Sequence, residues 1–202
     1  MSNNLAYQED FREELIGGKA VSMSPASTNH NRISGNIFYL FRTHLKGRSC
    51  EPFGDGEKVF LSKADHFVPD FMIVCDPDKI KQDGVHGAPD LVAEVLSPGT
   101  AKNDRGHKKN VYEACGVPEY WIVSPSDKTV EQYLLKDGRY DLHAVYVLHP
   151  DWVLERMSEK ERAEVATEFQ CSLYDDLTIR LEDVFYRTVY MCPSWTPERS
   201  TP

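Results

Sequence analysis

The sequence contains no apolar stretch long enough to cross a lipid bilayer. Its longest apolar runs, around Ile37–Phe41 and Phe71–Cys75, are far shorter than the ~20 residues that a transmembrane helix needs. The N-terminus also lacks the basic start and the following apolar stretch of a secretory signal. We therefore expect a cytoplasmic protein that has no membrane partner.

Cysteine is scarce and scattered. The five cysteines, none in a Cys-x-x-Cys pair, are Cys50, Cys75, Cys115, Cys171 and Cys192. An odd and dispersed set of thiols is not typical of a disulfide framework or of a zinc cluster. We therefore expect free thiols in a reducing compartment.

Several motifs of common enzyme classes are missing. There is no Gly-x-x-x-x-Gly-Lys phosphate loop, and Gly54-x-Gly56 lacks the third glycine of a dinucleotide-binding loop. No Gly-x-Ser-x-Gly nucleophile elbow occurs, and the seven histidines show no metal-ligand spacing. These absences argue against P-loop nucleotide hydrolysis, serine-hydrolase chemistry and a histidine-based zinc site.

Positive charge is also in short supply. The chain has 23 Lys and Arg residues against 32 Asp and Glu residues, a formal net charge of −9. Proteins that coat nucleic acid non-specifically rely on a basic surface, so this balance argues against that class. Ten acidic and four basic residues, a net charge of −6, lie between Pro150 and Phe185. The rest of the chain is less acidic and can carry a local basic groove.

A hydrophobic fraction of 41% over 202 residues is sufficient for the core of one domain. Apolar periodicity and turn residues predict alternating helices and strands. The expected helices are Glu9–Ile16, Asn29–Lys46 with a cap at Ser27 or Thr28, Lys102–Cys115, and the acidic helical insertion Met157–Phe169. The expected strands are Lys19–Met23, Lys58–Leu61, Phe71–Cys75, Leu91–Leu96, Tyr120–Val123, Leu177–Leu181, and a hairpin of Thr129–Leu135 with Arg139–Leu148. The polar segment Asp76–Ala88 is expected to be a loop.

This order of elements predicts a mixed α/β fold with a central sheet and helices on at least one face. We expect a single domain over residues 1–190, with a helical insertion at 150–170. Residues 191–202 are expected to form a C-terminal tail.

Two acidic residues stand out because they accompany buried strands. Asp70 follows Pro69 at the start of one predicted strand, and Glu94 lies inside the next, Leu-Val-Ala-Glu-Val-Leu. An ionised carboxylate in an apolar strand costs free energy unless it is paired or binds a metal. If the two strands are neighbours, Asp70 and Glu94 meet at one sheet edge and form a hard-oxygen site suited to Mg²⁺ or Mn²⁺.

The helix after the second of these strands places three polar side chains on one face. Asp104, Lys108 and Tyr112 follow one another at i, i+4 steps. The Lys108 ammonium can therefore be aimed at the two carboxylates. Metal-dependent phosphodiester hydrolysis uses such groups, since carboxylates hold the cations that activate a water and a lysine stabilises developing phosphate charge.

The start of the same helix is basic. Four basic residues accompany one acid, Asp104, for a local net charge of +3. The basic residues are Lys102, Arg105, Lys108 and Lys109. In an acidic protein this segment is a candidate contact for substrate phosphates.

Each candidate also has a purely structural interpretation. Asp70 suits a Pro-Asp turn at a strand entry, and Glu94 could be a buried acid that a lysine or arginine satisfies. Lys108 could form an i, i+4 ion pair with Asp104 on a solvated face, worth about 0.3–0.5 kcal/mol. Tyr112 suits packing against the sheet.

Four segments of the chain together form a specific combination. They are Val-Pro-Asp70, Gly87-Ala-Pro-Asp-Leu-Val-Ala-Glu94-Val-Leu-Ser-Pro98, Asp104-x-x-x-Lys108-x-x-x-Tyr112 and Gly116-Val-Pro-Glu119-Tyr-Trp121. This combination resembles the Uma family of bacterial restriction-endonuclease-like proteins, within the PD-(D/E)xK nuclease superfamily. The similarity extends from about Glu14 to Phe185.

The resemblance implies a restriction-endonuclease-like core, in which a mixed sheet is flanked by helices. It implies that Asp70 and Glu94 are the catalytic, metal-binding acids. The usual lysine two residues after the second acid is missing, because that position is Leu96. In this family the lysine is thought to come from the following helix, which points to Lys108.

The resemblance also implies roles for two earlier residues. The early helix of such nucleases often adds a carboxylate, for which Glu14 is the candidate metal ligand, and the family's histidine matches His30. An exposed helix acid and a helix-cap histidine are the structural alternatives. Gly17-Gly18-Lys19 stands where Asp-Gly-Glu is expected, which weakens any role for that corner. His30, Asp104 and Tyr112 are the expected supporting residues around the metal ligands.

Two functions therefore remain open. The first is a Mg²⁺- or Mn²⁺-dependent endonuclease whose partner is nucleic acid, with DNA preferred. The second is an inactive module of the same fold that binds a partner or serves in assembly. A homodimer is compatible with either function.

Overall fold

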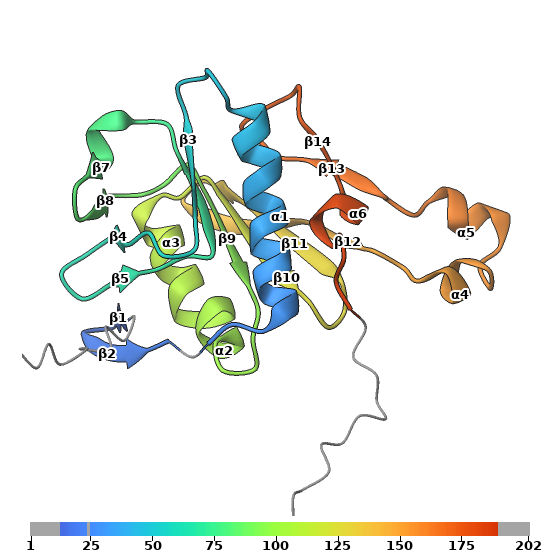
Figure 1. Ribbon diagram of the computed structural model, residues 1–202, viewed down its shortest axis with the longest axis horizontal. Helices are drawn as coiled ribbons and strands as arrows, with labels where there is room; N and C mark the ends of the chain where they lie inside the picture. The colour runs from blue at the N-terminus through green and yellow to red at the C-terminus, as the bar shows by residue number, and fades with distance from the viewer. Residues whose placement is uncertain (1–12, 24, 190–202) are drawn as a thin grey trace, which may run out of the picture.

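The computed structural model describes residues 13–23 and 25–189. Its main feature is a six-stranded sheet, the main sheet, with the strand order β12-β11-β10-β9-β6-β3 (Figure 1). Its strands are β3 (Glu51–Gly54), β6 (Phe71–Val74), β9 (Leu91–Val95), β10 (Glu119–Ser124), β11 (Thr129–Lys136) and β12 (Arg139–Val147). The β9–β10 pair is parallel and the other neighbours are antiparallel, so the predicted mixed sheet is confirmed.

A second sheet, the small sheet, has the strand order β2-β1-β5-β4-β8-β7. Its strands are β1 (Glu13–Ile16), β2 (Lys19–Ser22), β4 (Val59–Phe60), β5 (His66–Phe67), β7 (Ile80–Lys81) and β8 (Gly84–His86). Its buried residues Val59, Phe67 and Val85 share one hydrophobic cluster with Val92 of the main sheet and Tyr112. The small sheet therefore packs over one face of the main sheet.

Helix α1 (Thr28–His44) covers the opposite face of the main sheet (Figure 1). Its cap is Ser27, whose side chain accepts the backbone N–H of His30, as one of the two predicted caps. The helical spacing of its buried residues, among them Ile33, Ile37 and Phe41, turns one stripe toward Phe71, Ala93 and other apolar residues of the sheet.

The helix predicted over Lys102–Cys115 is present but irregular. Its three parts are α2 (Ala101–Asn103), a π-helical turn (Asp104–Lys108) and α3 (Lys109–Cys115). Gly116 ends it in the left-handed conformation, with φ of +82°, as its position after the last apolar residue predicts. Tyr112 packs into the cluster on the small-sheet side, so helices lie on both faces of the main sheet.

The remaining elements follow β12. They are α4 (Asp151–Leu154), α5 (Glu159–Ala163), β13 (Glu168–Gln170), β14 (Thr178–Arg180) and α6 (Leu181–Val184). Figure 1 shows α4 and α5 in an arm that projects away from the two sheets. Among the residues that the structure describes, no helix combines the length and the apolar character that a membrane span requires.

The helix predicted over Glu9–Ile16 is wrong in its described part, because Glu13–Ile16 forms strand β1. Gly17 and Gly18 have φ of +56° and +77°, the left-handed values that a two-residue hairpin turn requires at both positions. The two glycines therefore connect β1 to β2 instead of ending a helix. Residues 9–12 lie outside the described part of the chain.

Other boundaries also differ from the prediction. The helical insertion expected over Met157–Phe169 is wrong in its bounds, because the helix in this range covers only Glu159–Ala163. Phe169 instead belongs to β13, where it pairs with Ile179 of β14, and its ring centroid lies 5.1 Å from that of Trp121 and 4.6 Å from that of Tyr146. The segment Asp76–Ala88, expected as a loop, contains a 3₁₀ turn and strands β7 and β8. The tail predicted over 191–202 lies outside the described residues.

The prediction of free thiols is wrong for two cysteines. Cys50 and Cys75 form a disulfide just beyond the paired ends of β3 and β6. The antiparallel register makes them cross-strand neighbours, which their separation of 25 residues in the sequence does not reveal. Cys115 and Cys171 are free, and Cys192 lies outside the described residues.

Candidate active site

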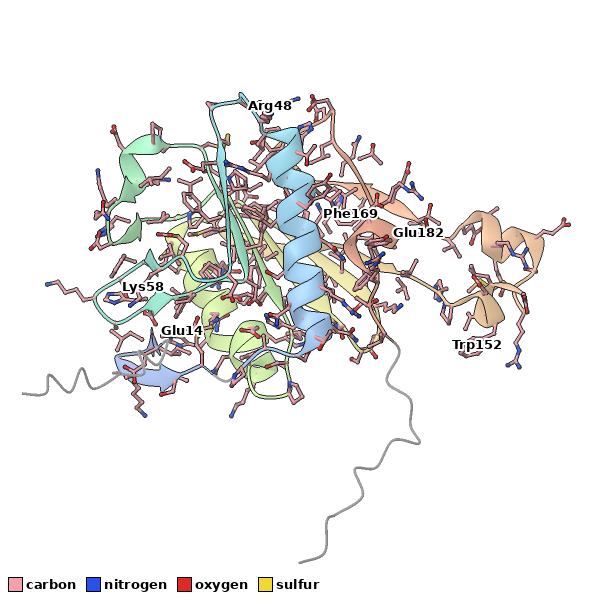
Figure 2. The ribbon with its side chains drawn as sticks, in the orientation of Figure 1. Glu14, Arg48, Lys58, Trp152, Phe169 and Glu182 are labelled. Atoms are coloured by element: carbon pink, nitrogen blue, oxygen red, sulfur yellow. A yellow bond between two sulfur atoms is a disulfide. The ribbon has the colours of Figure 1, made fainter. Side chains whose placement is uncertain are left out.

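Five charged side chains are buried where the main sheet faces the small sheet. They are Glu14, Asp70, Glu94, Asp104 and Lys108, each at most 6% exposed. We call these five the acidic cluster. They come from separate parts of the sequence, and Figure 2 shows Glu14 on the hairpin side of the molecule. The structure thus brings together the three residues that the sequence singled out as catalytic.

The pairing of β6 with β9 places the two predicted acids side by side. Phe71 lies opposite Ala93 in this antiparallel pair, so Asp70 falls opposite Glu94 one step further. Alternation along β9 sends Ala93 and Val95 to the α1 side and turns Glu94 to the other face. The Asp70 Oδ2 atom accepts the backbone N–H of Val95 at 2.6 Å, which fixes its position at the strand entry.

The first turns of α1 hold Asp70 from a second direction. His30 Nε2 lies 2.9 Å from Asp70 Oδ1, and the Ser34 hydroxyl donates to the Asp70 backbone carbonyl at 2.9 Å. Burial lowers the pKa of His30, but the hydrogen bond and the charge of Asp70 raise this pKa overall. The helix-cap alternative for His30 thus leaves out its main contact, since the ring engages Asp70.

Lys108 lies at the centre of the acidic cluster. Its Nζ atom is 2.7 Å from Glu14 Oε1 and 3.2 Å from Glu94 Oε1. The i, i+4 ion pair with Asp104 is present at 3.6 Å, but it is buried instead of solvated. Burial lowers the pKa of Lys108, yet the charges of Glu94, Glu14 and Asp104 raise it overall. The lysine is therefore a cation held among three carboxylates.

The environment of Glu94 disfavours the charged form of this carboxylate. Burial raises the pKa of Glu94 well above its usual range, and the charge of Lys108 only partly opposes this shift. The neighbouring charges of Asp104, Asp70 and Glu14 raise it further. One lysine does not compensate for the surrounding carboxylates, so the site holds more negative charge than its burial favours.

Two buried tyrosines donate hydrogen bonds to residues of the cluster. The Tyr112 hydroxyl donates to Glu94 Oε1 at 2.9 Å while its ring is fully buried, so Tyr112 both packs and orients Glu94. The Tyr120 hydroxyl donates to the backbone carbonyl of Asp104 at 2.9 Å. The Oδ1 atom of Asp104 is buried without a hydrogen-bond partner among the described residues. Burial raises the pKa of Asp104, against the opposing charge of Lys108.

These residues suit a divalent cation in kind and in charge. Carboxylate oxygens are the ligands that Mg²⁺ and Mn²⁺ prefer, and here three carboxylates surround one ammonium group while Asp70 lies beside them. As the side chains stand, however, no three or more His, Cys, Asp or Glu side chains within 13–23 and 25–189 are arranged to hold a metal ion. The Lys108 ammonium instead lies within 3.6 Å of an oxygen of each of Glu14, Glu94 and Asp104.

The predicted phosphate contacts lie apart from the acidic cluster. Arg105 forms an ion pair with Glu131 of β11. The Lys109 Nζ atom lies 3.6 Å from the centre of the Tyr133 ring, also on β11, and burial lowers the pKa of Lys109. Lys102 is exposed. The structure therefore directs Arg105 and Lys109 toward β11, while Lys102 and Arg105 are both exposed to solvent.

The sequence reasoning missed two residues beside the cluster. His107 directly precedes Lys108, and its Nε2 atom lies 2.7 Å from Asp65 Oδ1. Asp65 lies in a short turn before β5, where its sequence context resembles any polar loop. The only available signal was the position of His107 on the same helical segment as Lys108.

A search among solved structures finds a similar fold. A crystal structure from Anabaena variabilis ATCC 29413, described as a putative nuclease belonging to DUF820, matches with a TM-score of 0.63 and 19% sequence identity. The match covers 86% of this chain and 89% of that chain. At this level of identity the likeness shows the fold, which is restriction-endonuclease-like, as predicted.

Sequence comparisons point to the same group of proteins. Two proteins of Synechocystis sp. (strain ATCC 27184 / PCC 6803 / Kazusa) are similar, both named as uncharacterized. The protein slr1290 is 30% identical over 80% of this chain and 81% of its own length. The protein sll1609 is 28% identical over 62% of this chain and 73% of its own length. Residues 3–168 match the model of the family Uma2, whose description is "Putative restriction endonuclease". The chain that holds this acidic cluster therefore belongs to the Uma2 family.

Proposed function

We propose that this protein is an endonuclease that hydrolyses the phosphodiester bonds of DNA with Mg²⁺ or Mn²⁺ as its cofactor. The observation that carries the proposal is the buried acidic cluster, in which Asp70 lies opposite Glu94 and the Lys108 ammonium contacts Glu94 at 3.2 Å. The family description and the restriction-endonuclease-like fold support the same reaction class.

Asp70 and Glu94 are the proposed metal ligands, with Asp104 or Glu14 as a further oxygen donor. When bound, the cation would lower the pKa of a coordinated water and neutralise charge on the phosphate. The Lys108 ammonium would stabilise the negative charge that develops on the phosphate oxygens. His30 would keep Asp70 in place, and the Tyr112 hydroxyl would orient Glu94.

DNA is the proposed substrate, although the chain as a whole is acidic. Most of the excess negative charge lies between Pro150 and Phe185, and Figure 2 shows Trp152 of the projecting arm and Glu14 at opposite ends of the molecule. The exposed Lys102, near the start of the helical segment that carries Lys108, is the proposed phosphate contact. Binding through so few cations should be weak and sensitive to salt.

The test is cleavage of linear and supercoiled DNA, and of RNA, by the purified protein with Mg²⁺ or Mn²⁺. We expect metal-dependent cleavage of DNA that falls by at least ~10²-fold in Asp70→Asn, Glu94→Gln and Lys108→Met, as for removal of one group that stabilises transition-state charge. Glu182, which forms an exposed ion pair with Arg180, supplies the control. The Glu182→Gln variant should cleave DNA like the wild type. Intact nucleic acid under all these conditions would contradict the proposal.

A second candidate is an inactive binding module with the same fold. The specific observation in its favour is that Lys108 occupies the space among three carboxylates, where a cation would otherwise bind. Titration calorimetry with Mn²⁺ separates the two candidates. The nuclease requires binding that is lost in Asp70→Asn, whereas the inactive module requires no binding in the wild type.

A further inference from the structure

The hairpin that brings Glu14 to Lys108 has few other contacts. Strand β2 is exposed along all four of its residues, and β1 meets its other neighbour, β5, at the single pair of Leu15 with His66. Glu14 itself is 5% exposed, and its Oε1 atom accepts the backbone N–H of Val68 at 2.9 Å as well as contacting Lys108. The β1–β2 hairpin, which has few pairing contacts with the rest of the small sheet, therefore supplies the carboxylate that lies closest to the Lys108 ammonium.

The turn of this hairpin is fastened at one buried carboxylate. Asp65 is 8% exposed, and its Oδ1 atom accepts the backbone N–H of Gly17 at 2.9 Å. The Ser62 hydroxyl donates to Asp65 Oδ2 at 3.0 Å, which holds the carboxylate in place. A further bond from the Gly18 N–H to the Ala64 carbonyl, at 2.8 Å, adds to the same attachment.

The same carboxylate also reaches the segment that carries Lys108. His107 Nε2 lies 2.7 Å from Asp65 Oδ1, so one oxygen joins the hairpin turn and the π-helical turn. The His107 ring packs on the turn as well, because a Cβ atom at Gly17 would lie 3.5 Å from its Cε1 atom. Asp65 is thus the point where the element of Glu14 and the element of Lys108 are tied together.

We propose that Asp65 is a positioning residue that, through Gly17 and His107, holds the Glu14 carboxylate against the Lys108 ammonium. Its placement of Glu14 stands on geometry alone, while its effect on cleavage rests on the proposed function. Asp65 touches neither Lys108 nor the predicted acids, so it acts through the two elements that it joins. No motif in the sequence assigns it this role.

A second Asp–His pair provides a matched comparison. Asp83 Oδ1 lies 3.0 Å from His86 Nε2, but both side chains are exposed and both residues lie at one end of the small sheet. This pair ties no element to the acidic cluster. Removing Asp83 therefore removes an Asp–His contact of similar length without loosening the hairpin.

The test uses the backbone N–H of Val68, whose acceptor is Glu14 Oε1, as a reporter. Hydrogen exchange of the full-length protein, followed by NMR, should show at least 10-fold faster exchange at Val68 in Asp65→Ala than in the wild type. The Ile122 amide in the middle of β10 should exchange at the wild-type rate, which shows that the core is intact. Asp65→Asn, which retains an acceptor oxygen, should restore part of the protection, and Asp83→Ala should change nothing.

If Asp65→Ala does not fold, His107→Ala replaces it, because this side chain is 43% exposed and its loss removes one side of the connection. We then expect a smaller, still selective, acceleration at Val68. Unchanged exchange at Val68 in a folded variant of either residue would overturn the proposal. In cleavage assays, a positioning role predicts a lower kcat with little change in KM. Absence of any cleavage in the wild type would count against the nuclease function and would leave the exchange result to decide the role of Asp65.

Discussion

A buried charged residue of the acidic cluster can lower the stability of the fold and still be needed for the proposed chemistry. Glu94 is 2% exposed in an apolar strand, and burial raises its pKa well above the usual range. A buried carboxylate whose charge is only partly compensated costs free energy in the folded protein. A residue that the fold disfavours and the sequence nevertheless contains is a mark of functional sites.

At the residue scale, Glu94→Gln should therefore remove a pH-dependent loss of stability, and under the proposed function it should also remove cleavage. The folded protein binds the Glu94 proton more tightly than the unfolded chain, whose pKa is near 4.5, so ionisation destabilises the fold as the pH rises above this value. The variant has no such ionisation. We expect the free energy of unfolding of the variant, relative to that of the wild type, to be higher at pH 8 than at pH 4.5. Urea unfolding at the two pH values measures the difference, and a gain at pH 4.5 that exceeds the gain at pH 8 would contradict this explanation.

Individual elements differ in how firmly they are tied to the core. Strand β10 is anchored by Glu119, which is fully buried yet well satisfied. Its Oε1 atom accepts from Trp121 Nε1 at 2.5 Å and from Gln132 Nε2 at 2.6 Å. Its Oε2 atom accepts the backbone N–H and the hydroxyl of Ser172, both at 2.6 Å. One side chain thus fastens β10 to β11 and to the chain that follows β13.

At the element scale, Glu119→Ala should lower the free energy of unfolding by roughly 3 kcal/mol, because several buried donors lose their acceptor at once. The exposed Glu182, which pairs only with Arg180 at the surface, supplies the control. Glu182→Ala should change stability by less than ~0.5 kcal/mol. Thermal or urea unfolding of both variants tests the contrast, and equal losses would show that the Glu119 network contributes little.

The elements also show what the sequence can and cannot predict. Strands β6 and β9 and the helix after β9 were predicted because continuous apolar runs and helical spacing are local signals. The same local signals placed Asp70, Glu94 and Lys108 on their elements. Glu14 was assigned to a helix, because nothing local distinguishes a Gly-Gly helix end from a Gly-Gly hairpin turn. Contacts such as Asp65 with His107 depend on tertiary packing, which no spacing along the chain encodes.

The whole molecule consists of a packed body and one projecting arm. The body contains both sheets, α1 and the helix with Lys108, and its two hydrophobic clusters fill the spaces on either side of the main sheet. The arm contains α4 and α5, and Figure 1 shows it extending beyond the end of the sheets. None of the residues of α4 or α5 is buried. Stability should therefore reside in the body.

At this scale, replacing residues 151–165 with a short Gly-Ser linker should lower the free energy of unfolding by less than ~1 kcal/mol, since loop closure depends weakly on loop length. Phe169, just after the arm, is 5% exposed and stacks on Tyr146, so Phe169→Ala should cost about 3–5 kcal/mol. Urea unfolding of the two variants measures both effects. A loss on arm replacement as large as that of Phe169→Ala would mean that the arm is part of the cooperative unit.

The distribution of the acidic cluster along the chain has a consequence for protein synthesis. The carboxylates of Glu14, Asp70 and Glu94 precede Lys108 in the sequence, and a chain leaves the ribosome from its N-terminus. Until residue 108 has emerged, the nascent chain lacks the ammonium group that contacts Glu14 and Glu94 in the described structure, and strands β10, β11 and β12 of the main sheet have not yet been made. A fragment that ends before residue 108 therefore cannot hold the complete site.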